Sequence, residues 1–403
     1  MTQPQNPLAW LDGTQRFGVK LGLENTRRLL AAAGNPQDHL TFIHVAGTNG
    51  KGSVCAMMDS IFRAAGRKTG LYTSPHLVDL RERFRVDGEL ISPGELDAIL
   101  ERLRTAVRDW DHSPTFFEIT TVAALMYFAN AQVDIVLLET GMGGRLDATN
   151  AVSPRVTVIT PIGMDHQQWL GSTLAEIAAE KAGIIKPGVP VISSPQAPEA
   201  AAVISATAQR LNATLTVVAP ISDDVIVGLA GQHQRMNAAV AIAAVHAAGF
   251  SLPDSAILQG LREVRWPGRF QEVENFRLDG AHNPAGIRAL LDAWEAEYPD
   301  VKPLVIFGVL AEKGIEEMLA CIGLAAEAIW LVPIQNERAA QPEALAKHVP
   351  GDSKIWSSLG AALHAASESR RPVLITGSLY LIGEALDWFR IRPFGHEEPD
   401  ATR

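Results

Sequence analysis

The stretch that decides the fold is Phe42-Ile-His-Val-Ala46, which runs directly into Gly47-Thr-Asn-Gly-Lys-Gly-Ser53. The first run is typical of a buried strand, and a helical pattern opens at Ser53. Glycines at such a junction let the backbone turn its N–H groups toward a phosphate, while the helix N-terminus and Lys51 add positive potential. The segment therefore predicts a phosphate-binding loop in which Ser53 could reach a magnesium ion.

The match to a phosphate loop is incomplete. Val45 occupies the first glycine position of the pattern G-x-x-x-x-G-K-[ST], and Gly52 intervenes before the serine. The loop alone therefore does not specify a generic nucleotide-hydrolysing enzyme. The structural alternative is a glycine-rich turn between strand and helix that binds no ligand.

Short β-branched runs alternate with longer segments of helical period along the chain. The first series has expected strands at 41–45, 133–138 and 156–159 and helices at 53–65 and 173–182. The second has a strand near Phe276, strands at 304–309, 328–332 and 373–376, and helices at 284–297 and 380–388. This alternation predicts two α/β domains with doubly wound, mainly parallel sheets. Pro267 and Gly268 interrupt the pattern, so we expect an N-terminal domain at 1–270 and a smaller, Rossmann-like domain at 271–403.

The composition limits the classes of protein. The chain has 403 residues, 47% of them hydrophobic, and a formal charge of −10, which excludes a disordered protein and argues against broad nucleic-acid binding. Cys55 and Cys321 are far apart and have no metal-ligand spacing, as expected in a reducing cytosol. No export signal or run of about 20 apolar residues is present, so we expect a cytoplasmic protein without a membrane partner. Nothing in the sequence requires more than a monomer.

Two charged residues invite an interpretation from their positions. Glu139 ends the apolar run that begins at Val133, and the carboxyl ends of strands are where open α/β sheets bind ligands. It could hold Mg²⁺, or it could be a helix cap or a surface ion pair. Lys181 falls near a helix C-terminus, which is typical of a solvated lysine that interacts favourably with the helix dipole.

The run Gly47–Ser53 resembles the loop of the Mur ligase superfamily, and in particular of its folylpolyglutamate synthase/dihydrofolate synthase branch. The resemblance covers most of the chain, with the motifs in the expected order. The further motifs are Lys20-Leu-Gly-Leu-Glu24, Tyr72-Thr-Ser-Pro-His-Leu77, Gly143-Gly-Arg-Leu-Asp-Ala-Thr-Asn150, Glu180-Lys-Ala-Gly-Ile184, Pro267-Gly-Arg269, Asp279-Gly-Ala-His-Asn-Pro284 and Gly377-Ser-Leu-Tyr380.

The resemblance implies an ATP-dependent amide ligase that adds L-glutamate to a folate-type carboxylate through an acyl phosphate, with ATP held between two closing domains. It implies ATP contacts at Thr48, Asn49, Gly50, Lys51, Gly52, Ser53, Asn237, Arg269 and Asp279, and Mg²⁺ ligands at Ser53, Ser74, Glu139 and His166. It implies acceptor contacts at Thr115, Phe116, Phe117, Glu118, Leu146, Asp147 and Ala148. In addition, Lys51 would act in catalysis, His282 and Ser378 would orient glutamate, and Lys181 would be carbamylated, which requires an uncharged amine.

The residues by themselves leave structural alternatives for several of these assignments. These are a core position for Phe116 and His166, a turn carboxylate for Asp147, a helix N-cap for Asn237, a helix-start histidine for His282 and a loop serine for Ser378. The sequence also departs from the family pattern, because the segment 217–232 is short and Ala311-Glu-Lys-Gly314 replaces Asp-Lys-Asp.

Three functional hypotheses therefore remain. The first is the folate-glutamate ligase, for which dihydropteroate, a reduced folate or both could be the acceptor. The second is another Mur-type ligase that acts on a nucleotide-linked sugar. The third is a nucleotide-gated binding protein without catalysis. The expected partners are small molecules in all three cases.

Overall fold

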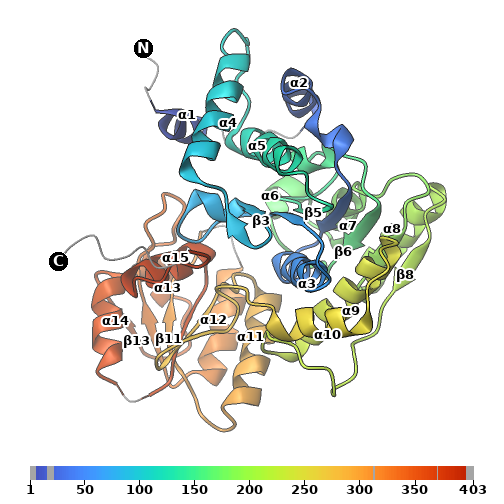
Figure 1. Ribbon diagram of the computed structural model, residues 1–403. Helices are drawn as coiled ribbons and strands as arrows, with labels where there is room; N and C mark the ends of the chain where they lie inside the picture. Colours follow the sequence, from blue (N-terminus) through green and yellow to red (C-terminus); the bar gives the residue numbers. More distant parts are fainter. Residues whose placement is uncertain (1–5, 16–21, 312–313, 370, 396–403) are drawn as a thin grey trace.

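The computed structural model describes residues 6–15, 22–311, 314–369 and 371–395 (Figure 1). Lys20 and Lys313, which belong to two of the sequence features above, lie outside this part of the chain. The described chain forms two α/β lobes, each built around its own mainly parallel sheet, as the alternating pattern predicts. No helix in the described ranges is long and apolar enough to cross a membrane.

The first sheet has the strand order β4-β3-β2-β5-β1-β6-β7-β8, and the strand that leads into the phosphate loop is central. Its pairs are parallel except β2–β3 and β3–β4. The strands are β1(Phe42–Ala46), β2(Thr69–Tyr72), β3(Phe84–Val86), β4(Glu89–Leu90), β5(Ile135–Glu139), β6(Val156–Ile159), β7(Val191–Ser193) and β8(Leu215–Val217).

Helices cover both faces of this sheet. They are α1(Pro7–Gly13), α2(Glu24–Ala32), η2(Pro36–His39), α3(Lys51–Ala64), η3(Leu80–Arg83), α4(Pro93–Ala106), α5(Phe116–Ala131), η4(Ala148–Ala151), α6(Gln167–Leu170), α7(Leu174–Ala182), α8(Pro198–Arg210), α9(Gln232–Ala247) and α10(Asp254–Glu263). Successive side chains of β1 point to opposite faces. Ile43 and Val45 therefore pack with α3, α9 and α10, while Phe42 packs with α4 and α5.

The second sheet has the order β13-β12-β11-β14-β10-β9, parallel except for β9–β10. Its elements are β9(Gln271–Val273), β10(Phe276–Asp279), α11(Pro284–Glu297), β11(Leu304–Phe307), α12(Ile315–Ala325), β12(Ala328–Leu331), α13(Pro342–Ala346), β13(Ser353–Ile355), α14(Leu359–Ser367), β14(Val373–Thr376) and α15(Leu379–Trp388). Because β9 opens this sheet, we propose a domain boundary at about residue 270.

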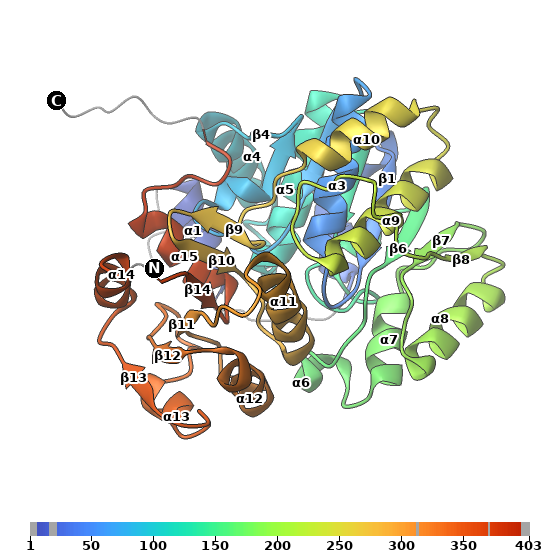
Figure 2. The ribbon, with the colours of Figure 1, turned by 90° about the horizontal axis from the view of Figure 1, so that it is seen from below.

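The elements expected from local pattern and those observed differ mainly at their ends. The strands at 156–159 and 373–376 and the helix at 284–297 have the expected limits. Helix α3 begins at Lys51, two residues before the expected start, because the loop glycine Gly50 supplies the left-handed N-cap. Figure 2 shows α11 of the second lobe beside α9 of the first. The carboxyl ends of β5 and β10, at Glu139 and Asp279, line one cavity between the lobes.

Candidate active site

The phosphate loop joins β1 to α3 at the centre of the first sheet, and its glycines are required by its geometry. Gly47 has φ +154°, and a Cβ there would lie 1.8 Å from Oγ1 of Thr160. Gly50 has φ +86°, and a Cβ there would lie 2.6 Å from Oδ1 of Asn237. Nζ of Lys51 donates to the carbonyl oxygens of Gly47 and Thr48, at 3.2 Å in each case.

A cavity of about 410 Å³ opens in front of this loop. Side chains from both lobes line it, and they include every residue for which the sequence implied an ATP contact: Thr48, Asn49, Gly50, Lys51, Gly52, Ser53, Asn237, Arg269 and Asp279. We call this space the nucleotide cavity. Its walls combine backbone amides, a lysine and an arginine, which suits a polyphosphate.

Asn237 is not a helix N-cap, so that alternative is wrong. Helix α9 begins at Gln232 with Gly231 as its N-cap, and Asn237 lies inside the helix with 3% of its surface exposed. Nδ2 of Asn237 donates to Oε1 of Gln234 at 2.9 Å, and the two amides form part of the cavity wall. Sequence pattern could not place this helix start, because Gly231 has no side chain to cap α9 and the helix opens with a polar run.

The second lobe reaches the nucleotide cavity through the loops that flank β10. Asp279 ends β10, and its carboxylate accepts from the backbone N–H groups of Phe270 and Ala281 at 2.9 and 2.8 Å. Asn49 of the phosphate loop and Asn283, the N-cap of α11, pair through both of their amide groups at 2.9 and 3.1 Å. This amide pair is a direct polar link between the lobes, and sequence analysis did not anticipate it.

Glu139 faces the nucleotide cavity from the end of β5 and is 5% exposed. Its Oε2 accepts from the backbone N–H of Ser74 at 3.0 Å. Burial raises the pKa of Glu139 above its ordinary value, although the charge of Lys51 opposes this shift. A cation beside this carboxylate would compensate its loss of hydration.

The four residues implied as Mg²⁺ ligands, Ser53, Ser74, Glu139 and His166, all line the nucleotide cavity. Three of them offer oxygen, as a hard cation prefers. In the described ranges no group of three or more His, Cys, Asp or Glu side chains gathers as a ready-made metal site. The donor set therefore fits a Mg²⁺ ion that shares its coordination with phosphates and water.

Lys181 is not a solvated lysine, so the interpretation from its helix position alone is wrong. It is 4% exposed, and its Nζ donates to the carbonyl oxygen of Gly47 at 2.8 Å. The end of α7 packs through Ala182 into the cluster under the phosphate loop, which turns Lys181 inward. Because Lys51 bonds the same oxygen, the two amino nitrogens lie within about 6 Å of each other.

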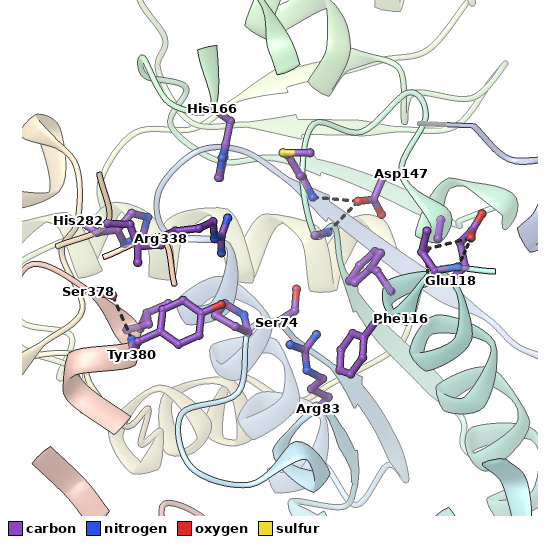
Figure 3. Close-up of a pocket in the computed structure, with 18 of the residues that line it drawn as sticks. Ser74, Arg83, Phe116, Glu118, Asp147, His166, His282, Arg338, Ser378 and Tyr380 are labelled. Carbon is purple, nitrogen blue, oxygen red and sulfur yellow. Dashed lines mark hydrogen bonds between the residues drawn. The ribbon is translucent and has the colours of Figure 1, made fainter. Parts of the chain in front are cut away.

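A second cavity of about 340 Å³ adjoins the first (Figure 3). It is lined by all the residues implied as acceptor contacts, Thr115, Phe116, Phe117, Glu118, Leu146, Asp147 and Ala148. We call it the acceptor cavity. Phe116 and Phe117 are only half-buried and both line this cavity, so Phe116 is not a closed core residue. A flat heteroaromatic ring would stack well there.

The two carboxylates of the acceptor cavity are already hydrogen-bonded within the protein. Glu118 and Thr115 form the capping box of α5, in which Oε2 of Glu118 accepts from the backbone N–H of Thr115 at 2.7 Å. Asp147 accepts from the N–H groups of Gly141, Met142 and Thr149. Asp147 is thus a turn carboxylate that also lines the cavity, and burial raises its pKa.

The two cavities meet at Ser74, His166 and His282, which line both. The Nε2 atoms of His166 and His282 each lie 3.8 Å from Oδ2 of Asp165, so a buried carboxylate lies between one histidine from each lobe. His166 is one-third exposed, which rules out the core alternative. Ser378 is the N-cap of α15, where its Oγ accepts from the N–H of Tyr380, and it lines the acceptor cavity.

Sequence reasoning missed Arg83, Arg338 and Tyr380, which also line the acceptor cavity (Figure 3). No local pattern distinguishes Arg83 from Arg81 two residues earlier. Tyr380 stands in a motif that the resemblance covers, but the resemblance implies no role for it. Only the packing of the two lobes brings these side chains to one cavity.

Comparison with known proteins identifies the family. The Mur ligase middle domain matches residues 45–190, and the glutamate ligase domain of Mur ligases matches residues 268–379. The dihydrofolate synthase/folylpolyglutamate synthase of Bacillus subtilis is 35% identical over 95% of this chain and 98% of its own length.

Solved structures agree with this relationship. Escherichia coli FolC in complex with DHPP and ADP matches with a TM-score of 0.89 and 32% identity, over 97% of this chain and 99% of its own. A bifunctional folylpolyglutamate synthase/dihydrofolate synthase with Mn, AMPPNP and L-glutamate bound matches with a TM-score of 0.88 and 31% identity, over 97% of this chain and all of its own. This chain therefore belongs to the folylpolyglutamate synthase/dihydrofolate synthase family of Mur ligases.

Proposed function

We propose that this protein is an ATP-dependent ligase that joins L-glutamate to a folate-type carboxylate. The observation that carries the proposal is the meeting of two cavities at Ser74, His166 and His282, one fronted by a phosphate loop and the other ending in an aromatic pair. This arrangement would set the carboxylate of an aromatic acceptor against the terminal phosphate of a nucleotide. The relatives named above carry the same activity in their names.

The chemistry requires activation, because a carboxylate is a poor electrophile. An acceptor carboxylate oxygen attacks the γ-phosphorus of ATP, the bond to the bridging oxygen breaks, and ADP leaves. The amine of L-glutamate then attacks the carbonyl carbon of the acyl phosphate, and inorganic phosphate departs as the amine loses a proton. The protein mainly positions the reactants and excludes water, and closure of the two lobes provides both.

Lys51 and Arg269 are the groups of this chain that we assign to the phosphates. In the structure Lys51 bonds carbonyls of its own loop, and a phosphate would be a stronger partner for its ammonium group. Arg269, in the segment that leads into the second lobe, faces the same space. Pairing of Asn49 with Asn283 holds the lobes in this relation, so that groups from both act on one nucleotide.

We propose Mg²⁺ as the metal, held by Ser53, Ser74, Glu139 and His166. A solved relative contains Mn, which supports a divalent ion of this kind. When bound, the ion would offset negative charge on the transferred phosphoryl group. Glu139 supplies the anionic ligand, and the backbone of Ser74 fixes one of its oxygens.

We also propose that Lys181 is carbamylated. Its Nζ is buried against the phosphate loop and lines the nucleotide cavity. Attack of the uncharged amine on CO₂, with loss of a proton, would convert this buried cation into an anion that could bind metal. Mass spectrometry of the intact protein under CO₂ should show one added carboxyl group, absent in Lys181→Met. An unmodified wild-type mass under these conditions would exclude this role.

We propose that one chain acts alone in the cytoplasm. A single chain supplies the lining of both cavities. Both cysteines are free thiols, as expected for a reducing compartment. Sedimentation at assay concentrations should give the mass of one chain.

The decisive experiment offers Mg-ATP and L-glutamate with dihydropteroate in one reaction, tetrahydrofolate in a second and a nucleotide-linked sugar acid in a third. The expected products are ADP, phosphate and an acceptor heavier by one glutamyl unit in the first reaction, the second or both. Glutamylation of the sugar alone would favour the other Mur-type reaction. Nucleotide binding without phosphate release in any reaction would favour the non-catalytic hypothesis.

A further inference from the structure

The acceptor cavity contains a buried arginine that no sequence pattern singled out. Arg83 ends η3 and is 7% exposed. Figure 3 shows its guanidinium turned into the cavity between Ser74 and Phe116. Arg338, the other arginine of this cavity, lies on an exposed loop of the second lobe. A guanidinium in the wall of a substrate cavity is suited to recognising an anion.

The hydrogen-bond and ring contacts of Arg83 do not include a carboxylate. Its Nε donates to Nδ1 of His76 at 2.9 Å, and its guanidinium carbon lies 5.2 Å from the centre of the Phe116 ring. Nδ1 of His76 accepts this hydrogen bond, and an imidazole carries no negative charge that could pair with the guanidinium. Within the described part of the chain, no aspartate or glutamate lies within ion-pair distance of Arg83. Its guanidinium also interacts with the Tyr72 side chain, and the buried Glu139 acts on its charge only from farther away.

The acidic side chains of the cavity do not supply that partner either. Glu118 is committed to the capping box with Thr115, and Asp147 accepts from three backbone N–H groups of the neighbouring turn. The negative charges of the cavity are therefore stabilised within the protein, while a buried positive charge faces the space for the acceptor. Burying a cation in this way is costly unless a ligand pairs with it.

The position of Arg83 separates it from the reaction centre. Arg83 lines the acceptor cavity but not the nucleotide cavity, whereas Ser74, His166 and His282 line both. The carboxylate that receives the phosphoryl group must lie where the cavities meet. A carboxylate paired with Arg83 therefore lies on the acceptor side of that point.

We infer that Arg83 binds the carboxylate of a folate acceptor that does not react. The inference rests on the proposed ligase function and names a determinant of its acceptor specificity. A pteroate has one carboxylate, which becomes the acyl phosphate. A folate carries a glutamyl residue with two, of which one reacts and the other needs a partner. Arg83 thus decides whether the enzyme extends folates as well as pteroates.

The test compares two acceptors in variants of this one residue. Arg83→Gln removes the charge, Arg83→Lys keeps it without the planar fork, and Arg81→Gln is a matched control in the same short helix whose arginine pairs with Asp79. With tetrahydrofolate, kcat/KM of Arg83→Gln should fall about 10- to 100-fold, the range of a lost charge-assisted hydrogen bond, and Arg83→Lys should fall less. With dihydropteroate, every variant should stay within about threefold of wild type.

Retained dihydropteroate activity shows that the variants fold, so a selective loss cannot come from misfolding. A substrate-side experiment is independent of the variants: tetrahydrofolate whose non-reacting carboxylate is an amide should be a poor substrate for wild type. Arg83→Gln should not discriminate this amide from tetrahydrofolate.

Two results would overturn the role of Arg83 while the ligase function stands. One is an equal loss of both acceptor activities in Arg83→Gln, and the other is a wild-type protein that glutamylates dihydropteroate but not tetrahydrofolate. Wild-type protein that glutamylates neither acceptor would instead overturn the proposed function itself.

Discussion

A methyl group added at Gly383 should separate the two lobes where α15 of the second packs on the backbone of the first. Gly383 lies within α15 and packs on the backbone of Leu77, three residues after Ser74. A Cβ at this position would lie 2.0 Å from the carbonyl oxygen of Leu77 and 2.9 Å from its carbonyl carbon. The obstacle is backbone, so rotation of a side chain cannot relieve it.

The size of the effect follows from this distance. For the added Cβ to reach ordinary van der Waals distance from the Leu77 carbonyl oxygen, α15 and the Leu77 segment must move apart by roughly 1.4 Å. The start of α15 carries Ser378, which would move relative to Ser74 by a similar amount. Misplacement of reacting groups by about 1 Å can cost on the order of 100-fold in rate. The free energy of unfolding should fall by about 0–2 kcal/mol, because an overpacking cost of about 1–3 kcal/mol is opposed by about 1 kcal/mol from the higher helix propensity of alanine.

The assay is the initial rate of ADP release at saturating ATP, with L-glutamate and acceptor varied, together with thermal unfolding. Gly360→Ala is the matched control, because Gly360 lies within helix α14, where a Cβ would approach only Trp388, at 3.5 Å. We expect Gly383→Ala to lose about 10- to 100-fold in kcat/KM for glutamate and Gly360→Ala to be near wild type. A folded Gly383→Ala protein with wild-type kinetics would refute the reasoning that this contact sets the register of the lobes.

Three further outcomes follow from single side chains. Lys51→Ala should reduce kcat about 100- to 1,000-fold in the ADP-release assay without unfolding the protein; unchanged turnover would contradict its role at the phosphates. Phe117→Ala should raise KM for the acceptor about 10-fold but leave KM for ATP unchanged, since Phe117 lines only the acceptor cavity; equal effects on both would speak against stacking. Burial lowers the pKa of His44 to about 3, so below pH 6.5 the unfolded chain binds a proton that the folded protein does not. The stability that the neutral, buried His44 contributes is therefore present above pH 6.5 and is lost as the pH falls toward 3. Between pH 7 and pH 5, the free energy of unfolding measured in urea should fall by about 2 kcal/mol less in His44→Gln than in wild type. Equal decreases in the two proteins would show that His44 does not cause the pH dependence.

His44 illustrates how the strand beneath the loop also supports the acceptor cavity. Its Nε2 lies 2.8 Å from Oγ1 of Thr149, which in turn donates to Asp147. This chain of hydrogen bonds holds the turn that contributes Leu146 to Ala148 to the cavity. The sequence places His44 in a buried strand, but its polar partner lies 105 residues away and cannot be inferred from local pattern.

The errors of sequence analysis concern residues whose surroundings are set by other elements. Lys181 has the local context of a solvated lysine, yet α7 packs under the phosphate loop and buries it. The residue pattern allows Asn237 to cap a helix, yet Gly231 is the N-cap and α9 begins at Gln232. Asn237 therefore lies in the helix interior. For Lys181 a local preference is overridden by packing, whereas for Asn237 the helix begins earlier in the chain than a cap at that position would require.

The sequence by itself determined the alternation of strands and helices, the phosphate loop and the family, because hydrophobic period and glycine-rich turns are local properties of the chain. Only the tertiary structure decided that the implied contacts divide between two adjoining cavities, that Asn49 pairs with Asn283 across the lobes, and that Arg83 is buried without an ion pair to any described acidic residue. These features depend on distances between segments far apart in the chain. Side-chain burial and charge pairing are fixed by how the lobes pack, and no short stretch of sequence carries that information.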